Sequence, residues 1–126
     1  MNYIKSTKTK DFLQVDSGLN HLLRPTLYGS HHEIINLSNP AGKKKEYDVV
    51  GYICEKDTFA EKRKIPETSV GDLICFKNAG AYGFEMSSNY NSRLKPAEVC
   101  IYNNKILKIR EAQSLNDLLI GQIDIF

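Results

Sequence analysis

The chain has 126 residues, of which 41% are hydrophobic and 25% charged, and this matches a single globular domain. Its net charge of +2 is too small to indicate a nucleic-acid-binding protein, and no apolar stretch approaches the roughly 20 residues that span a bilayer. The first residues lack the apolar core of a signal peptide, and the three cysteines form no C-x-x-C. We therefore predict a cytoplasmic domain without nucleic-acid, membrane or metal partners.

Short runs rich in β-branched and aromatic residues predict strands, in chain order, over Asp11 to Val15, Glu33 to Asn36, Tyr47 to Cys54, Leu73 to Lys77, Glu98 to Tyr102 and Lys105 to Ile109. Asn39 to Gly42 is a predicted turn, followed by a basic run, Lys43 to Lys45, that we assign to a solvated loop. Asn103-Asn104 predicts a two-residue hairpin loop between the last two strands.

Helical signals are few. Asn20 to Leu23 could form one turn before Pro25, and Ser114 is a suitable N-cap for a short C-terminal helix that places Asp117 in its first turn. Many strands at short spacing indicate a mainly β domain, either a barrel or a sandwich.

Three stretches differ from ordinary turns, and the first holds Arg24 and Tyr28 on either side of Pro25. A guanidinium and a phenol held in this way suit a carboxylate ligand. Taken alone, however, a structural pairing of Arg24 with a nearby acid is the better interpretation.

The second stretch lies at the end of the predicted strand that starts at Tyr47. This stretch contains Cys54, Glu55 and Asp57. A thiol can transfer a proton and a carboxylate can bind an ammonium group. A buried cysteine beside a polar turn explains the same residues without any function.

The third stretch surrounds Tyr82 with small residues, Ala79 to Gly83, and continues to a dense donor set, Asn89 to Arg93. Small residues let the backbone approach a ligand closely. The alternative is a glycine-rich turn followed by a capped helical turn.

The remaining cysteines and the histidines suggest no site. Cys75 and Cys100 lie inside predicted strands, where core packing is expected. His21, His31 and His32 lack partners at metal-ligand spacing, and His31-His32 is predicted to lie on a loop surface.

Taken together and in order, these stretches resemble the C-terminal domain of diaminopimelate decarboxylases, in the pyridoxal-phosphate-dependent group of ornithine, diaminopimelate and arginine decarboxylases. The resemblance extends over roughly residues 10 to 119. The matching segments are Val15-Asp16-Ser17-Gly18-Leu19-Asn20, Arg24-Pro25-Thr26-Leu27-Tyr28-Gly29, Val49-Val50-Gly51-Tyr52-Ile53-Cys54-Glu55, Gly71-Asp72, Ala79-Gly80-Ala81-Tyr82-Gly83, Ser88-Asn89-Tyr90-Asn91-Ser92-Arg93 and Pro96-Ala97-Glu98-Val99.

This resemblance implies a Greek-key-like β-barrel with a short C-terminal helix, as a single domain over residues 1–126. Members of the family pair such a domain with an α/β barrel that holds the cofactor on a lysine, and the active site lies between subunits of a homodimer. The chain contains no run of βα units that would form a cofactor barrel, and its lysines lie in loops or on strand surfaces. We therefore expect it to be inactive alone.

The resemblance also implies roles for five residues. Arg24 and Tyr28 would grip a carboxylate of meso-diaminopimelate, and Glu55 would bind the ammonium group at its distal stereocentre. Cys54 would donate a proton beside the reacting carbon, and Tyr82 would reach both substrate and pyridoxal phosphate. The expected reaction yields L-lysine and carbon dioxide.

One departure from the family pattern affects the second stretch, because Lys56 stands where the family usually has Ser-Gly before its aspartate. The role of Asp57 is therefore left open. Two alternatives also remain: a stand-alone docking or regulatory module, and the same fold acting on another basic amino acid.

Overall fold

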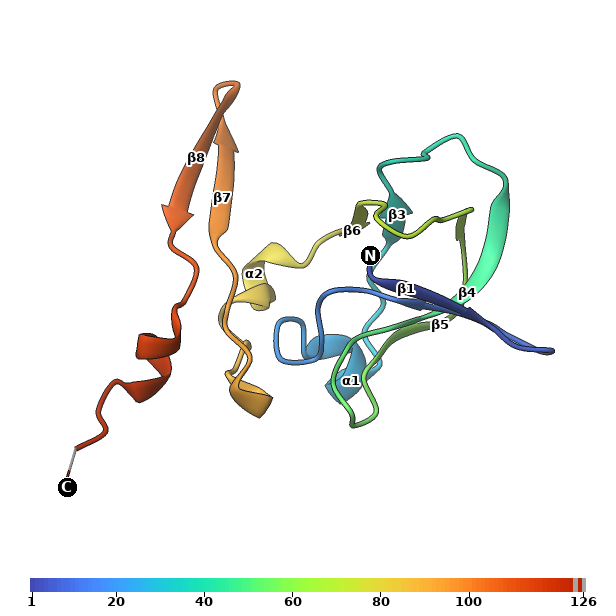
Figure 1. Cartoon of the computed structure of the whole chain (residues 1–126). Coiled ribbons are helices and arrows are strands. Elements are labelled where there is room, and N and C mark those ends of the chain that lie inside the picture. Colours follow the sequence, from blue (N-terminus) through green and yellow to red (C-terminus); the bar gives the residue numbers. More distant parts are fainter. Residues whose placement is uncertain (124, 126) are drawn as a thin grey trace. The chain divides into compact units, whose positions relative to one another are not determined.

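The computed structural model describes residues 1–123 and 125. It divides the chain into two compact units, Met1–Ser87 and Ser88–Phe126. Each unit is built mainly from strands and also contains a few short helical segments (Figure 1).

The first unit contains a four-stranded sheet in the order β1-β2-β4-β5, formed by Tyr3–Ser6, Asp11–Gln14, Lys44–Val50 and Thr58–Pro66. β1 pairs antiparallel with β2, and β4 pairs antiparallel with β5, whereas β2 and β4 run parallel. β1 and β5 are the edges of this sheet, and among the described strands no hydrogen-bonded ladder closes it into a barrel. A second, two-stranded sheet pairs β3 (Ile34–Asn36) with β6 (Ile74–Phe76).

The core of the first unit lies where these two sheets meet. Alternation along β2 and β4 turns Leu13, Tyr47 and Val49 inward, and each is at most 1% exposed. The two sheets touch through Phe59 of β5 and Phe76 of β6, whose ring centroids lie 4.8 Å apart. The full buried apolar cluster is Leu13, Val15, Leu22, Ile34, Tyr47, Val49, Phe59, Ala60 and Ile65.

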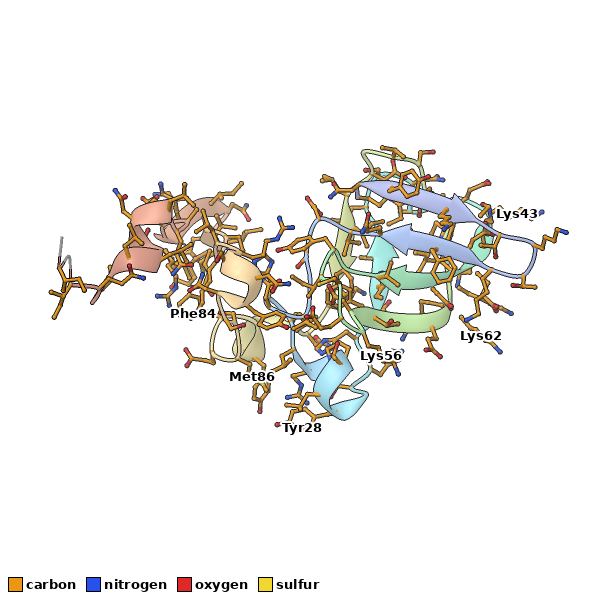
Figure 2. All side chains as sticks on the ribbon, turned by 60° about the horizontal axis from the view of Figure 1, so that its bottom comes forward. Tyr28, Lys43, Lys56, Lys62, Phe84 and Met86 are labelled. Carbon is orange, nitrogen blue, oxygen red and sulfur yellow. The ribbon has the colours of Figure 1, made fainter. Side chains whose placement is uncertain are left out.

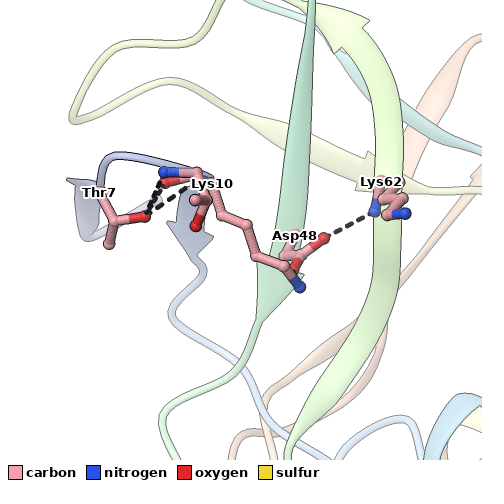
Figure 3. Close-up of polar contacts among 5 residues, drawn as sticks. Thr7, Lys10, Asp48 and Lys62 are labelled. Carbon is pink, nitrogen blue, oxygen red and sulfur yellow. Dashed lines mark hydrogen bonds and ion pairs between the residues drawn. The ribbon is translucent and has the colours of Figure 1, made fainter.

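A buried carboxylate, Asp48 of β4, links three segments of the sheet (Figure 3). It accepts a hydrogen bond from Nζ of Lys10, at 2.6 Å, and another from the backbone N–H of Lys62 in β5, at 2.7 Å. Burial alone raises the pKa of Asp48, but these two donors outweigh it and hold the pKa below its ordinary value. Asp48 is therefore held as an anion where β4 and β5 shift register.

The first unit also contains two short helices. The structure places α1 at Arg24–Tyr28, and the predicted turn before Pro25 is present as a hydrogen-bonded turn in which the N–H of Leu22 donates to the carbonyl oxygen of Gly18. Pro25 lies at the start of the helix, where its fixed φ suits the first turn and its missing N–H is no loss. The second helix, α2, is a single turn over Gly80–Gly83.

Several sequence-based predictions about the sheet are corrected. β4 ends at Val50 rather than Cys54, and it begins at Lys44, so part of the basic run is strand rather than loop. The structure adds β1 and the nine-residue β5, which were not predicted. His32 is buried, with its Nδ1 3.0 Å from the carbonyl oxygen of Lys77, and does not lie on a loop surface.

The second unit is an antiparallel hairpin between two 3-10 turns: η1 (Tyr90–Ser92), β7 (Glu98–Tyr102), β8 (Lys105–Arg110) and η2 (Leu115–Leu119). The hairpin loop at Asn103-Asn104 is confirmed, since both residues have positive φ, 49° and 57°, as a tight primed turn requires. Ser114 caps η2 through a reciprocal pair with Asp117, so the predicted C-terminal helix is present as a 3-10 turn.

No described residue of this second unit is buried. Among the residues that the structure describes, no helix is long and apolar enough to cross a membrane.

Candidate functional site

Arg24 and Tyr28 are the first and last residues of α1. They are four positions apart, so they lie on the same side of the helix. Arg24 is half-buried, whereas Tyr28 is 64% exposed. Gly29 ends the helix in the left-handed conformation, with φ of 64°, which a glycine adopts without strain. The helix therefore offers a guanidinium and a phenol from one short rigid element.

The structure brings Tyr82 of α2 to Arg24. The guanidinium carbon of Arg24 lies 4.2 Å from the centroid of the Tyr82 ring. This distance is typical of a cation–π contact. Two site residues that are far apart in the sequence are thus direct neighbours.

Cys54 and Glu55 lie on the loop between β4 and β5, and both are exposed. The Cys54 thiol donates to Oε2 of Glu55, with the two atoms 3.4 Å apart. The loop closes at its base through the N–H of Gly51, which donates to the carbonyl oxygen of Asp57 at 2.8 Å. A thiol and a carboxylate are thereby presented together on an exposed loop.

Asp57 differs from its loop neighbours because its side chain points inward and is 5% exposed. It accepts hydrogen bonds from the backbone N–H groups of Leu19 and Ile53. Burial raises the pKa of Asp57 above its ordinary value, although these two donors act in the opposite direction. The aspartate whose role the sequence left open is a structural centre of the loop.

A pocket of about 390 Å³ lies beside α1 and this loop. Figure 2 shows Tyr28 at α1 and Lys56 on the turn that leads into β5. The pocket is lined by residues next in sequence to the predicted ones, including Pro25 and Lys56, together with His31 and Arg63. In the part of the chain that the structure describes, its lining includes none of the five predicted site residues.

Sequence reasoning missed Arg63, which lines this pocket together with Lys56 and Glu61. Arg63 of β5 donates to the carbonyl oxygen of His32 at 2.9 Å, and its Nη1 lies 2.6 Å from Nε2 of His31. No sequence signal could place Arg63 here, because β5 itself was not predicted.

Residues 1–80 match the family described as the pyridoxal-dependent decarboxylases, in their C-terminal sheet domain. The chain belongs to this family. The match covers the four-stranded sheet, α1 and the loop that bears Cys54 and Glu55.

Individual members of the decarboxylase family are similar over almost the whole chain. The diaminopimelate decarboxylase of Methanothermobacter thermautotrophicus is 47% identical over 124 residues, which are 97% of this chain and 29% of that protein. The crystal structure of the M. jannaschii diaminopimelate decarboxylase in co-complex with L-lysine superposes with a TM-score of 0.90 at 32% identity, over 98% of this chain and 28% of that one. The corresponding structure from Helicobacter pylori, also with L-lysine, gives a TM-score of 0.83 at 41% identity, over 94% and 29%.

The chain spans less than a third of the length of these relatives. The family implies pyridoxal phosphate as the cofactor. The hydrogen-bond donors of Tyr82 and Arg24 are suited to contact one side of this molecule. Tyr82 is 49% exposed, and a methyl group added at Gly80 or Gly83 would meet no described atom within 4 Å, so the backbone beside Tyr82 is accessible. A phenol next to the Arg24 cation suits an anionic group such as a phosphate.

Proposed function

We propose that this chain is the substrate-specificity and dimer-partner half of a diaminopimelate decarboxylase, which converts meso-diaminopimelate to L-lysine and carbon dioxide. The similarity to two diaminopimelate decarboxylases with bound L-lysine supports this substrate. The single observation that carries the proposal is the Cys54–Glu55 pair, a thiol and a carboxylate in contact on an exposed loop.

The substrate bears an ammonium and a carboxylate at each end. A specific site therefore needs a bidentate hydrogen-bond donor for a carboxylate and an acceptor for an ammonium group. Arg24 supplies a fork for a carboxylate, and Tyr28 adds a further donor from the same side of α1. Glu55 accepts from the ammonium group at the distal stereocentre. Tyr82 contacts both substrate and cofactor, and its stacking against Arg24 fixes the plane of the guanidinium.

Pyridoxal phosphate, when bound, supplies the electron sink for the carbanion left by carbon dioxide. The residues of this chain would then deliver a proton to one carbon and exclude the wrong substrate. Cys54 donates this proton from its thiol, and Glu55 lies beside it to hold the distal end of the substrate.

The proposed assembly is a homodimer in which the Cys54–Glu55 loop enters the site of the partner subunit. The cofactor lysine belongs to an α/β barrel that these residues do not include, so we propose that the chain is inactive alone. The two sheets of the first unit would form the Greek-key-like barrel of the family, joined by side-chain packing such as Phe59 on Phe76 rather than by a closed ladder. The three cysteines are free thiols, which fits a reducing cytoplasm.

Complementation tests this function. The purified chain, mixed with a separately made cofactor barrel of a diaminopimelate decarboxylase, is expected to release L-lysine and carbon dioxide from meso-diaminopimelate. Cys54→Ala in the same mixture is the matched control and should lower the rate about 100-fold or more.

Turnover by the chain alone with pyridoxal phosphate would disprove the proposed inactivity. A mixture that forms no lysine, while the same barrel is active with its own sheet domain, would disprove the function and favour a docking module. Faster release of carbon dioxide from another basic amino acid would favour the variant substrate.

A further inference from the structure

We propose that Asp57 is the positioning residue of this site: its buried carboxylate holds the Cys54–Glu55 loop against the segment that leads into α1. The inference rests on the proposed function, since the groups being positioned are those of the decarboxylase site. Asp57 acts through the backbone, because its carboxylate accepts hydrogen bonds from the N–H of Ile53 at the start of the loop and from the N–H of Leu19 in a distant segment.

The Asp57 carboxylate accepts two backbone hydrogen bonds from segments far apart in the sequence. Oδ2 of Asp57 lies 2.9 Å from the N–H of Ile53, the residue immediately before Cys54. Oδ1 lies 2.8 Å from the N–H of Leu19, thirty-eight residues away in sequence. One side chain therefore fixes the start of the reactive loop to a distant segment.

The segment that contains Leu19 forms the turn before α1. The carbonyl oxygen of Gly18 accepts from the N–H groups of His21 and Leu22, which forms the turn before α1. Leu22 is 6% exposed and belongs to the apolar core. The turn is thus anchored, and it leads directly to Arg24. By holding Leu19, Asp57 couples the carboxylate-binding helix to the thiol-bearing loop.

Two glycines, Gly18 and Gly51, leave the space that the Asp57 carboxylate occupies. A Cβ at Gly51 would lie 2.1 Å from Oδ2 of Asp57, and a Cβ at Gly18 would lie 2.8 Å from the same atom. Side-chain atoms do not approach this closely, so the two glycines leave the room that the carboxylate fills. This explains why both sequence segments carry a glycine at these positions.

The two hydrogen bonds at position 57 require an aspartate rather than an asparagine. Both partners of Asp57 are N–H donors, so the side chain must offer two acceptors. An asparagine has one acceptor oxygen, and its NH₂ group would face an N–H. Asp57→Asn therefore keeps the shape but loses one of the two attachments, which leaves the loop tethered on one side.

The experiment compares Asp57→Asn with Asp48→Asn in the complete protein loaded with pyridoxal phosphate. Asp48 is the matched control, because it is equally buried and accepts a backbone N–H, but lies on β4 outside the loop. We measure kcat and KM for meso-diaminopimelate, and the alkylation rate of Cys54 by iodoacetamide with peptide mapping to separate it from Cys75 and Cys100. Alkylation requires no turnover.

For Asp57→Asn we expect KM to rise and kcat/KM to fall about 10- to 100-fold, because a displacement of about 1 Å at positioned groups has effects of this size. The alkylation rate of Cys54 should change about fivefold or more as the loop loosens. Asp48→Asn should leave KM and the Cys54 rate within about twofold, since partial unfolding alone lowers the active fraction, and so the apparent kcat, without changing KM.

The proposal is overturned if folded Asp57→Asn keeps both values within about twofold of the wild type, or if Asp48→Asn changes them equally. If Asp57→Asn does not fold, Gly18→Ala disturbs the same contact, because the added Cβ would lie 2.7 Å from Cγ1 of Ile53 and 2.8 Å from Oδ2 of Asp57, and an unchanged KM there overturns the proposal. Absence of turnover in the wild type would disprove the proposed function, while the alkylation comparison would still decide the role of Asp57.

Discussion

The guanidinium carbon of Arg24 lies 4.2 Å from the ring centroid of Tyr82, so the cation of one short helix rests on the aromatic face of another. Contacts of this kind at partly exposed sites contribute about 0.5–1 kcal/mol. The contact restricts the orientation of Arg24 before any ligand arrives. Preorganisation of this kind improves affinity by reducing the entropy lost on binding.

The pair Tyr82→Leu and Tyr82→Phe separates the ring from the hydroxyl. Both variants lose the hydroxyl contact proposed for the cofactor, but only Tyr82→Leu also loses the stacking on Arg24. We expect KM for meso-diaminopimelate to be about two- to fivefold higher in Tyr82→Leu than in Tyr82→Phe, in the complete protein at saturating pyridoxal phosphate. Equal KM values in the two variants would show that stacking does not position Arg24.

Glu55→Gln tests the ammonium contact. The substitution keeps the size of the side chain but removes its charge, and hydrogen bonds to charged groups contribute about 1.5–3 kcal/mol. We expect kcat/KM for meso-diaminopimelate to fall about 10- to 100-fold, measured by lysine release. Glu46→Gln, at an exposed position of β4, is the control and should stay within about twofold. The idea fails if both variants behave alike.

Asp48→Asn tests the polar link between β4 and β5. The folded-state pKa of Asp48 is below its ordinary value of 3.8. The unfolded chain therefore binds the proton more readily, so this contribution to stability is present above pH 3.8 and is lost as the pH falls through the folded-state pKa. We expect Asp48→Asn to lower the free energy of unfolding by about 1–3 kcal/mol at neutral pH.

Urea unfolding across this pH range provides the measurement. The difference between wild type and Asp48→Asn should shrink on acidification below pH 3.8. Asp16→Asn is the control, because the Asp16 side chain is 73% exposed and should matter by less than about 0.5 kcal/mol. A difference between wild type and Asp48→Asn that stays constant with pH would contradict the assigned role of the charge.

Asn104→Val tests the hairpin turn of the second unit. Asn104 has φ of 57°, and a β-branched residue in this region is destabilised by about 1–2 kcal/mol. Hydrogen exchange at the amides of Tyr102 and Lys105, the hydrogen-bonded type of pair that flanks a two-residue loop, should accelerate accordingly. Asn104→Gly fits the same conformation and should leave exchange within about threefold. Equal protection in both variants would mean that the turn does not set the register.

Elements with strong local signals were predictable from the sequence. The hairpin followed from Asn103-Asn104 between two apolar runs, and the cap at Ser114 followed from its spacing to Asp117. β5 was missed because its central residues, Glu61 to Lys64, are all charged, as suits an edge strand. β4 was extended too far because Tyr52 and Ile53 read as strand, whereas Asp57 draws this segment into a loop.

The sequence proposes the residue types of the candidate site but not their arrangement. Arg24, Cys54 and Tyr82 were identified from ordered motifs and a family resemblance. Their contacts depend on how distant segments pack, and the Arg24–Tyr82 stacking has no local signal. The inward orientation of Asp57 was equally hidden, because a Cys-Glu-Lys-Asp run looks the same whether its last carboxylate is buried or exposed.

The parallel pairing of β2 with β4 sets the order in which this domain can assemble. Parallel neighbours need a long crossover, and here the crossover contains α1 and with it Arg24 and Tyr28. The β1–β2 and β4–β5 hairpins can form from local contacts, whereas the parallel pair must first close a large loop, which is the slower event. We therefore expect α1 to reach its place late in folding, together with the final joining of the sheet.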